Sequence, residues 1–377
     1  MSTEDLATAI DHLPLVDHHV HGALASAVDR PTLELLLTES DRPVPTWMTQ
    51  FDSQLGFAIR RWCAPVLDLP PHADAADYVA RREELGAPEV ARRLLAASGI
   101  GHYLVETGYQ GDEVLSPAEM ASTSGVPADE VVRLEAVLED LARHEVRAAD
   151  LPSRFPEVLA ERTVGAVGLK SIVAYRCGFD FDPQRPSDVE VVAAAENWLR
   201  SGAGRVADPV LLRFLLWSGV DRGLPLQLHA GYGDPDIELH RCDPLLLTRF
   251  IKLVEPFGVD LLLLHCYPFH RNAGYLAQVF PHVYFDVGLG VNHSGVRSSA
   301  VVAESLELAP FAKILFSSDA WGPPELHHLG ALLWRRGMRK ALSPWVEAGE
   351  WSAHDAIRVA RMIGRDNARR VYRLAAR

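Results

Sequence analysis

The chain has 377 residues, of which 48% are hydrophobic and 23% are charged, and its formal net charge is −13. This is the composition of an ordinary globular protein and argues against a disordered chain, while the length fits two domains or one large α/β barrel. No basic stripe offsets the negative charge, so nucleic acid and anionic membranes are excluded as expected partners, and a small-molecule ligand is favoured.

The four cysteines are scattered and form neither a CxxC pair nor a disulfide framework. The first ten residues, MSTEDLATAI, lack the apolar core of a signal peptide, and no apolar run reaches the roughly 18 residues of a membrane helix. We therefore expect a soluble cytoplasmic protein.

The first predicted element is a buried strand over residues 13–17, which is followed by three crowded histidines, His18, His19 and His21. From residue 26 to residue 98, segments such as RPTLELLLTES and DYVARREELGAPEVARRLLAASG have apolar residues at helical spacing. We interpret residues 26–98 as a mainly helical insertion within a single domain that spans residues 1–377.

Short apolar runs then recur along the chain, and each ends in polar or glycine residues. They cover residues 101–107, 164–171, 224–231, 259–268, 282–288 and 313–320, with helical patterns between most of them. Residues 129–142 are ambiguous between a helix and a further short strand. About eight strands alternating with helices predict a parallel (β/α)8 barrel, a TIM barrel, rather than an open sheet. Helical patterns from residue 323 onward predict extra C-terminal helices outside this barrel.

Polar residues stand where five of these strands end: His19 and His21, Lys170, His229, His265 and Asp319. In a parallel barrel all carboxyl ends of the strands face one mouth, so these residues should meet there. Imidazole, carboxylate and a modified lysine are suitable ligands for Zn²⁺ or Mn²⁺. Side chains two residues apart on extended backbone point the same way, which lets His19 and His21 hold one metal while His18 points away and supports them.

Residues that follow the strand ends are candidates for substrate binding. Tyr175 and Arg176 follow the Lys170 strand, and Arg176 suits a substrate carboxylate, although an ordinary salt bridge is the alternative. Tyr232 and Asp234 follow His229 and suit an ammonium or hydroxyl group, although a glycine-rich turn is the alternative.

Three further candidates are Glu106 and Glu135, which end the two less certain strands, and Trp321. Either glutamate suits an amine or a solvated face, and Trp321 suits the lining of the site or the core. The other histidines of the later chain are interpreted as non-ligands: His240, His270, His282, His293, His327 and His328.

Several segments taken together resemble the amidohydrolase superfamily, and in particular its branch related to FluG proteins. The resemblance is carried by DHHVHG, GLKSIVAYRCGF, LQLHAGYGD, LLLLHCYP, FSSDAWGPPELHHLGAL and DNARRVY. It runs from residue 13 to the end and is weakest over residues 26–98. FluG-like proteins can carry a fused glutamine-synthetase-like portion, and this chain has no such portion.

The resemblance implies a barrel that holds one or two divalent metals, with zinc favoured and manganese as the alternative. A binuclear site would use His19, His21 and Asp319 for the more buried metal, His229 and His265 for the second, and an N-carboxylated Lys170 as the bridge. A single-metal site would use His19, His21, His229 and Asp319, which leaves His265 to polarise the substrate.

The implied reaction is hydrolysis by a metal-activated water, with Asp319 as general base and then acid. We expect cleavage of an amide C–N bond, including γ-glutamyl and other amino-acid-derived amides. Alternatives are a non-oxidative decarboxylase or a sugar-acid isomerase on the same barrel, or a catalytically silent regulatory homologue. We also expect a homo-oligomer, with residues 26–98 as the candidate interface.

Overall fold

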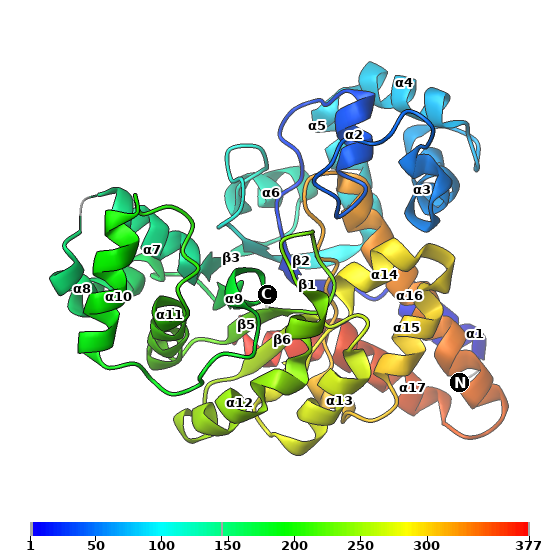
Figure 1. Ribbon diagram of the computed structural model, residues 1–377. Helices are drawn as coiled ribbons and strands as arrows, with labels where there is room; N and C mark the ends of the chain where they lie inside the picture. The colour runs from blue at the N-terminus through cyan, green and yellow to red at the C-terminus, as the bar shows by residue number, and fades with distance from the viewer. Residues whose placement is uncertain (1–2, 145, 376–377) are drawn as a thin grey trace.

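The computed structural model describes residues 3–144 and 146–375. One sheet of seven parallel strands runs in chain order through the centre of the molecule (Figure 1). Its strands are β1 (Leu15–Val20), β2 (Ile100–Glu106), β3 (Ala128–Arg133), β4 (Gly168–Ser171), β5 (Leu226–Ala230), β6 (Leu261–His265) and β7 (Val283–Phe285). Buried apolar runs form these strands because a parallel sheet is covered on both faces.

Residues 314–320 close this sheet into a barrel. The Leu315 N–H donates to the carbonyl of Phe285 in β7 at 3.0 Å, and the His18 N–H in β1 donates to the carbonyl of Phe316 at 3.2 Å. The segment therefore takes the place of an eighth strand between β7 and β1, although its pairing is irregular. The predicted (β/α)8 barrel is confirmed.

Two predicted boundaries need correction. The ambiguous stretch 129–142 contains both elements, because β3 ends at Arg133 and α7 (Leu134–Arg143) begins directly after it. Glu135 therefore lies in the first turn of a helix and does not end a strand. The first strand continues to Val20 rather than ending at residue 17, and its register against β2 shifts between Asp17 and Val20.

Apart from isolated β-bridges at Ala23 and Leu24, the regular structure between β1 and β2 is helical. It contains α2 (Arg30–Leu35), α3 (Gln54–Ala58), α4 (Ala75–Leu85) and α5 (Ala87–Ser98), which gather at one end of the molecule, at the top of Figure 1. Buried polar contacts fix this region to the long helix α16 (Pro324–Glu347): the Tyr78 hydroxyl donates to Glu325 Oε1 at 2.8 Å, and Arg82 Nε donates to it at 2.6 Å.

The remaining helices surround the barrel. They are α1 (Thr3–Asp11), α6 (Pro117–Ser124), α8 (Leu151–Arg162), α9 (Val173–Cys177), α10 (Asp188–Arg200), α11 (Pro209–Arg222), α12 (Thr248–Val254), α13 (His270–Val279), α14 (Gly288–Ser294), α15 (Ser298–Ser305), α17 (Ala353–Arg361) and α18 (Asn367–Val371). The helices after the eighth strand agree with the predicted C-terminal extension. In the described ranges no helix is both long enough and apolar enough to cross a membrane.

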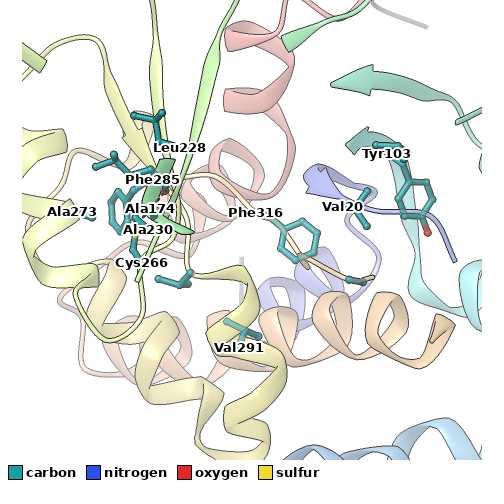
Figure 2. Close-up of a cluster of buried hydrophobic side chains, with 14 of the residues drawn as sticks. Val20, Tyr103, Ala174, Leu228, Ala230, Cys266, Ala273, Phe285, Val291 and Phe316 are labelled. Atoms are coloured by element: carbon teal, nitrogen blue, oxygen red, sulfur yellow. Dashed lines mark hydrogen bonds between the residues drawn. The ribbon is translucent and has the colours of Figure 1, made fainter. Parts of the chain in front are cut away.

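Alternation along the strands separates the apolar residues into two layers. The outer layer packs against the helices and includes Val20, Tyr103, Leu228, Phe285 and Phe316 (Figure 2). The inner layer fills the barrel and is closed by the last helix: Val16, Leu104, Val131, Leu262, Leu264, Tyr284, Leu315, Ala368, Val371 and Tyr372. Positions two residues beyond inner-layer residues face the same interior nearer the strand ends, and most of them are polar: His18, Glu106, Arg133, Asp286 and Ser317.

Candidate metal centre

Three predicted ligands meet at the carboxyl ends of the strands. His19, His265 and Asp319 each offer a ligand atom within 4.8 Å of the others. Asp319 Oδ1 lies 3.0 Å from His19 Nε2, and Asp319 Oδ2 lies 3.3 Å from His265 Nε2. His21 is next to them, with its Nε2 3.9 Å from Asp319 Oδ1. Imidazole nitrogens around a carboxylate form a donor set that suits a divalent metal.

Gln227 fixes the orientation of His19. The Gln227 amide nitrogen donates to the carbonyl of His18 at 2.8 Å and to the hydroxyl of Tyr372 at 2.7 Å, so its oxygen faces His19 Nδ1 at 2.8 Å. An amide oxygen only accepts hydrogen bonds, and this assigns the proton of His19 to Nδ1. The lone pair of His19 is therefore on Nε2, the atom that faces Asp319.

His18 supports this layer from below. Its Nε2 lies 3.1 Å from Asp286 Oδ2, and its Nδ1 lies 3.0 Å from the hydroxyl of Tyr372. The register shift in β1 places consecutive histidines in the barrel interior, where the predicted strict alternation would have separated them. His18 therefore contacts Tyr372, which helps to orient His19 through Gln227. In the described chain its ring nitrogens make no hydrogen bond or ion pair with Asp319, so His18 is not a metal ligand beside that residue.

Lys170 is buried beside His19. Its Nζ lies 3.2 Å from His19 Nε2, and the residue is 2% exposed. Burial lowers the pKa of Lys170 to about 8, because the nearby Asp319 and Glu106 carboxylates only partly offset the cost of a desolvated ammonium. A lysine with this pKa has a substantial neutral fraction near pH 8, which is the form that can react with carbon dioxide.

His229 and His265 have ring nitrogens without a hydrogen bond to any described residue. The two ring centroids are 4.7 Å apart. His229 Nε2 and both nitrogens of His265 are buried and have no hydrogen bond within the described part of the chain. Burial lowers the pKa of both imidazoles well below its usual range, so both are neutral at pH 7. A buried polar atom without a partner is costly, and a metal ion would satisfy these nitrogens. The residues present therefore fit a divalent metal.

The backbone is strained at two of these residues. His265 has φ +68° and Asp319 has φ +50°, which is a left-handed conformation that favours glycine. Each such residue costs on the order of 1–3 kcal/mol. Hydrogen bonds compensate: the His265 N–H donates to Asp286 Oδ1 at 3.0 Å, and the Asp319 N–H donates to the His19 carbonyl at 3.2 Å. Strain held in this way is concentrated at functional sites.

Burial also raises the pKa of Asp319 well above its usual range, against the lowering effect of Lys170. The charge of Glu39 adds to this increase. Glu39 belongs to the insertion and lies 3.5 Å from His293 Nε2, whose ring is 5.5 Å from that of Tyr232. The insertion therefore reaches the same end of the barrel as Asp319.

Glu106 is next to His21 and is paired with an arginine. Its Oε2 lies 3.3 Å from His21 Nδ1 and 2.5 Å from Arg133 Nη2, and its Oε1 accepts from Arg133 Nε at 3.1 Å. Burial alone would raise the pKa of Glu106, but the Arg133 guanidinium holds it below its usual range. Sequence reasoning missed Arg133, because the end of β3 was not assigned; its position two residues after Val131 was the available signal.

Other predicted residues also lie near the cluster. The Tyr175 ring is 4.4 Å from the His229 ring. The Trp321 ring is 5.6 Å from that of Tyr109, a residue that sequence reasoning missed, and the Tyr109 ring is 6.4 Å from that of His21. Tyr175, Trp321 and Tyr109 therefore surround the histidines with aromatic surface.

The Asp234 side chain makes a hydrogen bond within its own turn, which agrees with the alternative of a glycine-rich turn. Its Oδ1 accepts from the N–H of Asp236 at 2.8 Å. Its negative charge nevertheless acts on the hydroxyls of Tyr175 and Tyr109 and contributes, after burial, to raising the pKa of both. The loop that follows β5 thus lies near the cluster.

Two predicted substrate residues have protein partners instead. Arg176 Nη2 lies 3.1 Å from Glu139 Oε1 and its Nη1 donates to the Val206 carbonyl at 3.3 Å, which favours the salt-bridge alternative. Glu135 Oε1 accepts from the Ser171 hydroxyl at 2.6 Å and from the Ile172 N–H at 3.0 Å, and so supports the loop after β4. These partners occupy only part of each charged group, since Arg176 Nε and Glu135 Oε2 have no hydrogen bond among the described residues, and substrate contact by either residue stays a prediction.

Comparison with known proteins gives one curated relative of substantial similarity. The chain is 30% identical over 278 residues to the protein fluG of Emericella nidulans. The match covers 65% of this chain but 32% of the relative, so the chain spans about a third of that protein's length.

Solved structures share the whole fold. A protein from Lactobacillus casei ATCC 334, described in its name as a metal-dependent hydrolase, has a TM-score of 0.86 and 28% identity over 98% of this chain and 99% of that one. A uronate isomerase from Bacillus halodurans has a TM-score of 0.65 and 13% identity over 98% and 96%, and a glucuronate isomerase from Caulobacter crescentus has 0.63 and 17% over 100% and 94%. At these identities the two isomerases show the fold alone.

A family model described as amidohydrolase matches residues 133–374. That span holds the strand ends with Lys170, His229, His265 and Asp319, and it is more than half of the chain. The resemblance seen in the sequence motifs is thereby confirmed, and this protein belongs to the amidohydrolase family.

Proposed function

We propose that this protein is a metal-dependent hydrolase that cleaves the amide C–N bond of a small molecule. The supporting observation is the group of buried, neutral imidazoles with unpartnered nitrogens around Asp319. Such nitrogens are ready to bind a metal without first losing a proton. Amino-acid-derived amides, including γ-glutamyl compounds, are the substrates proposed.

The metal would be held by residues at the strand ends: His19, His21, Lys170, His229, His265 and Asp319. Zinc is favoured over manganese because the donors are mainly nitrogen. When bound, such an ion lowers the pKa of water and polarises a carbonyl group. Lys170 would take part as a bridging carbamate if two ions bind, since an ammonium cannot bind a metal.

Asp319 would move the proton in this reaction. One carboxylate oxygen faces His19 and the other faces His265, so Asp319 is central to the cluster. It would accept a proton from the attacking water and deliver it to the leaving nitrogen. Burial raises the pKa of Asp319 above its usual range, which makes this carboxylate a better proton acceptor than an ordinary aspartate and so supports the role. Tyr175 and Trp321 would exclude bulk water from the reacting groups.

A sugar-acid isomerase is the second candidate. It is supported by the similarity in fold to two uronate isomerases. At 13% and 17% identity, a shared fold does not imply a shared substrate. We therefore propose the hydrolase as the first candidate.

The test is metal content per chain, by elemental mass spectrometry on protein purified without chelator, followed by assays with a panel of amides and uronates. We expect one or two equivalents of zinc and hydrolysis of an amide that stops on chelation. A zinc-loaded protein that isomerises a uronate and cleaves no amide would favour the second candidate. A protein that takes up no zinc or manganese would be a silent homologue.

We also propose that copies of this chain associate through the insertion. Trp47 and Phe57 lie there with 81% and 56% of their surface exposed, which is unusual for large apolar side chains. Mass measurement in solution tests this proposal, and a protein that stays monomeric at all concentrations would contradict it.

A further inference from the structure

Arg133 is a cation inside the barrel, close to the candidate metal centre. It is the last residue of β3 and its side chain is 9% exposed. Alternation with the inner-layer residue Val131 points it into the barrel interior. Placing a guanidinium here is costly unless acceptors surround it.

Among the described residues, acceptors contact one edge of this guanidinium. The planar group offers two edges that can each hold a carboxylate by two parallel hydrogen bonds. Glu106 occupies the edge formed by Nε and Nη2. The other edge, between Nη1 and Nη2, has no acceptor among residues 3–144 and 146–375. Arg133 can therefore bind a second carboxylate while it keeps the first.

Aromatic rings also lie near this guanidinium. The Tyr109 ring centroid lies 5.6 Å from the guanidinium carbon of Arg133, and the Trp321 ring lies 5.6 Å beyond it. Aromatic neighbours lower the local dielectric, which increases the attraction between the guanidinium and an anion. Two other cations near the cluster are already engaged: Lys170 contacts His19, and Arg176 contacts Glu139.

One carboxylate oxygen links this edge to the candidate metal centre. Glu106 Oε2 contacts both Arg133 Nη2 and His21 Nδ1, at 2.5 and 3.3 Å. An anion on the open edge of Arg133 would thus be separated from His21 by only one side chain.

We infer that the open edge of Arg133 binds a carboxylate of the substrate, and that the substrates of this site are small carboxylate-bearing amides. The carboxylate would be a few bonds from the reacting carbonyl, because Arg133 is close to His21. This inference rests on the proposed function for the identity of the reacting group. It transfers to Arg133 the role that the sequence assigned to Arg176.

The experiment measures binding, so that it does not depend on turnover. Glutarate and its neutral counterpart glutaramide are titrated by calorimetry into zinc-loaded protein, with metal content and thermal melting recorded for every variant. The main variant combines Arg133→Met with Glu106→Gln, which avoids leaving a buried carboxylate unpaired. The second variant is Arg133→Lys, which keeps the charge but loses the bidentate edge.

Arg213→Met is the matched control. Arg213 lies on helix α11, and its side chain is also 9% exposed. Its Nη1 donates to Asp182 Oδ2 at 2.9 Å. Its partners lie outside the candidate metal centre, so this substitution removes a similarly buried arginine and leaves the centre unchanged.

We expect glutarate to bind at least about tenfold more tightly than glutaramide, as a bidentate charged hydrogen bond predicts. The double variant should bind glutarate at least about tenfold more weakly, Arg133→Lys should be intermediate, and Arg213→Met should match the parent protein. Unchanged glutarate affinity in the double variant, or in Arg133→Lys where the double variant does not fold, would overturn the inference. Equal affinity for the acid and the amide would overturn it too.

These outcomes separate the inference from the proposed function. A protein that binds glutarate through Arg133 but cleaves no amide would keep the anion site and lose the hydrolase. A protein that cleaves neutral and carboxylate-bearing amides equally well, with or without Arg133, would keep the hydrolase and lose the anion site.

Discussion

The two sides of the candidate metal centre differ in how their histidines are held. On one side, His19 has its Nδ1 fixed by Gln227, which is fixed in turn by Tyr372. On the other side, both ring nitrogens of His265 lack a hydrogen bond in the described chain, and so does Nε2 of His229. This difference indicates one position whose histidine is preorganised for a metal and one where no hydrogen bond orients the His265 ring. Asp319 faces both sides.

The largest expected effect is on metal binding, and it distinguishes the two sides. His19→Ala should abolish metal binding at the preorganised position and, with it, activity. His229→Ala should leave at least one equivalent of zinc, because the preorganised ligands remain. Elemental analysis of both variants checks this. Equal loss of metal from the two variants would show that the sides are not distinct.

Asp319→Asn tests the residue that joins the two sides. The amide keeps the shape of the side chain but cannot accept a proton from water. Turnover should fall by about a hundredfold or more, which is the usual effect of losing general acid–base catalysis. Most of the metal should remain, because the histidines are unchanged. Rates compared at equal metal content provide the measurement, and retained turnover would remove Asp319 from its proposed role.

Gln227→Leu should weaken the preorganised side without removing a ligand. It deletes the acceptor that holds the Nδ1 proton of His19, and losses of such supporting groups typically reduce metal affinity about 10–100-fold. Competition with a zinc chelator gives the affinity. Because Gln227 and Tyr372 are hydrogen-bonded, Tyr372→Phe should show a smaller effect in the same direction. No change in either variant would contradict preorganisation.

The effect expected to change activity least is on stability in acid. His327 lies behind His21, and its Nε2 is 3.1 Å from the His21 carbonyl. Burial lowers the pKa of His327 to about 4, whereas an unfolded histidine titrates near 6.5. The unfolded chain therefore binds the proton first, and stability should be complete above pH 6.5 and decrease as the pH falls toward 4, by roughly 3 kcal/mol from this residue.

Thermal melting of metal-free protein between pH 7 and pH 4 measures this loss. His327→Gln can still donate to the His21 carbonyl but does not titrate, so its melting temperature should depend less on pH. An identical pH dependence in both proteins would show that other groups cause the loss.

Much of the fold could be predicted because local pattern determines it. Apolar runs with helices between them specified a parallel barrel, and polar residues at strand ends specified one mouth. The ligand candidates His19, His265 and Asp319 were found in this way, because strand direction alone brings them together. The segment that closes the barrel was found as an apolar run, although its irregular pairing could not be seen.

Partner choice could not be predicted in the same way. Arg176 and Arg133 both follow apolar runs near the predicted site. Arg176 is paired with Glu139, whereas Glu106 contacts one edge of Arg133 and leaves its other edge open. Likewise the register shift in β1 decides that His18 supports the site from within the barrel. Such pairs join residues far apart in the chain or depend on a bulge, and no local periodicity encodes them. The sequence by itself determined the family, the barrel and the set of candidate ligands, because strand order and alternation fix where those residues lie. Only the tertiary structure decided which charges are neutralised and which remain available, because that depends on distances between side chains on different strands.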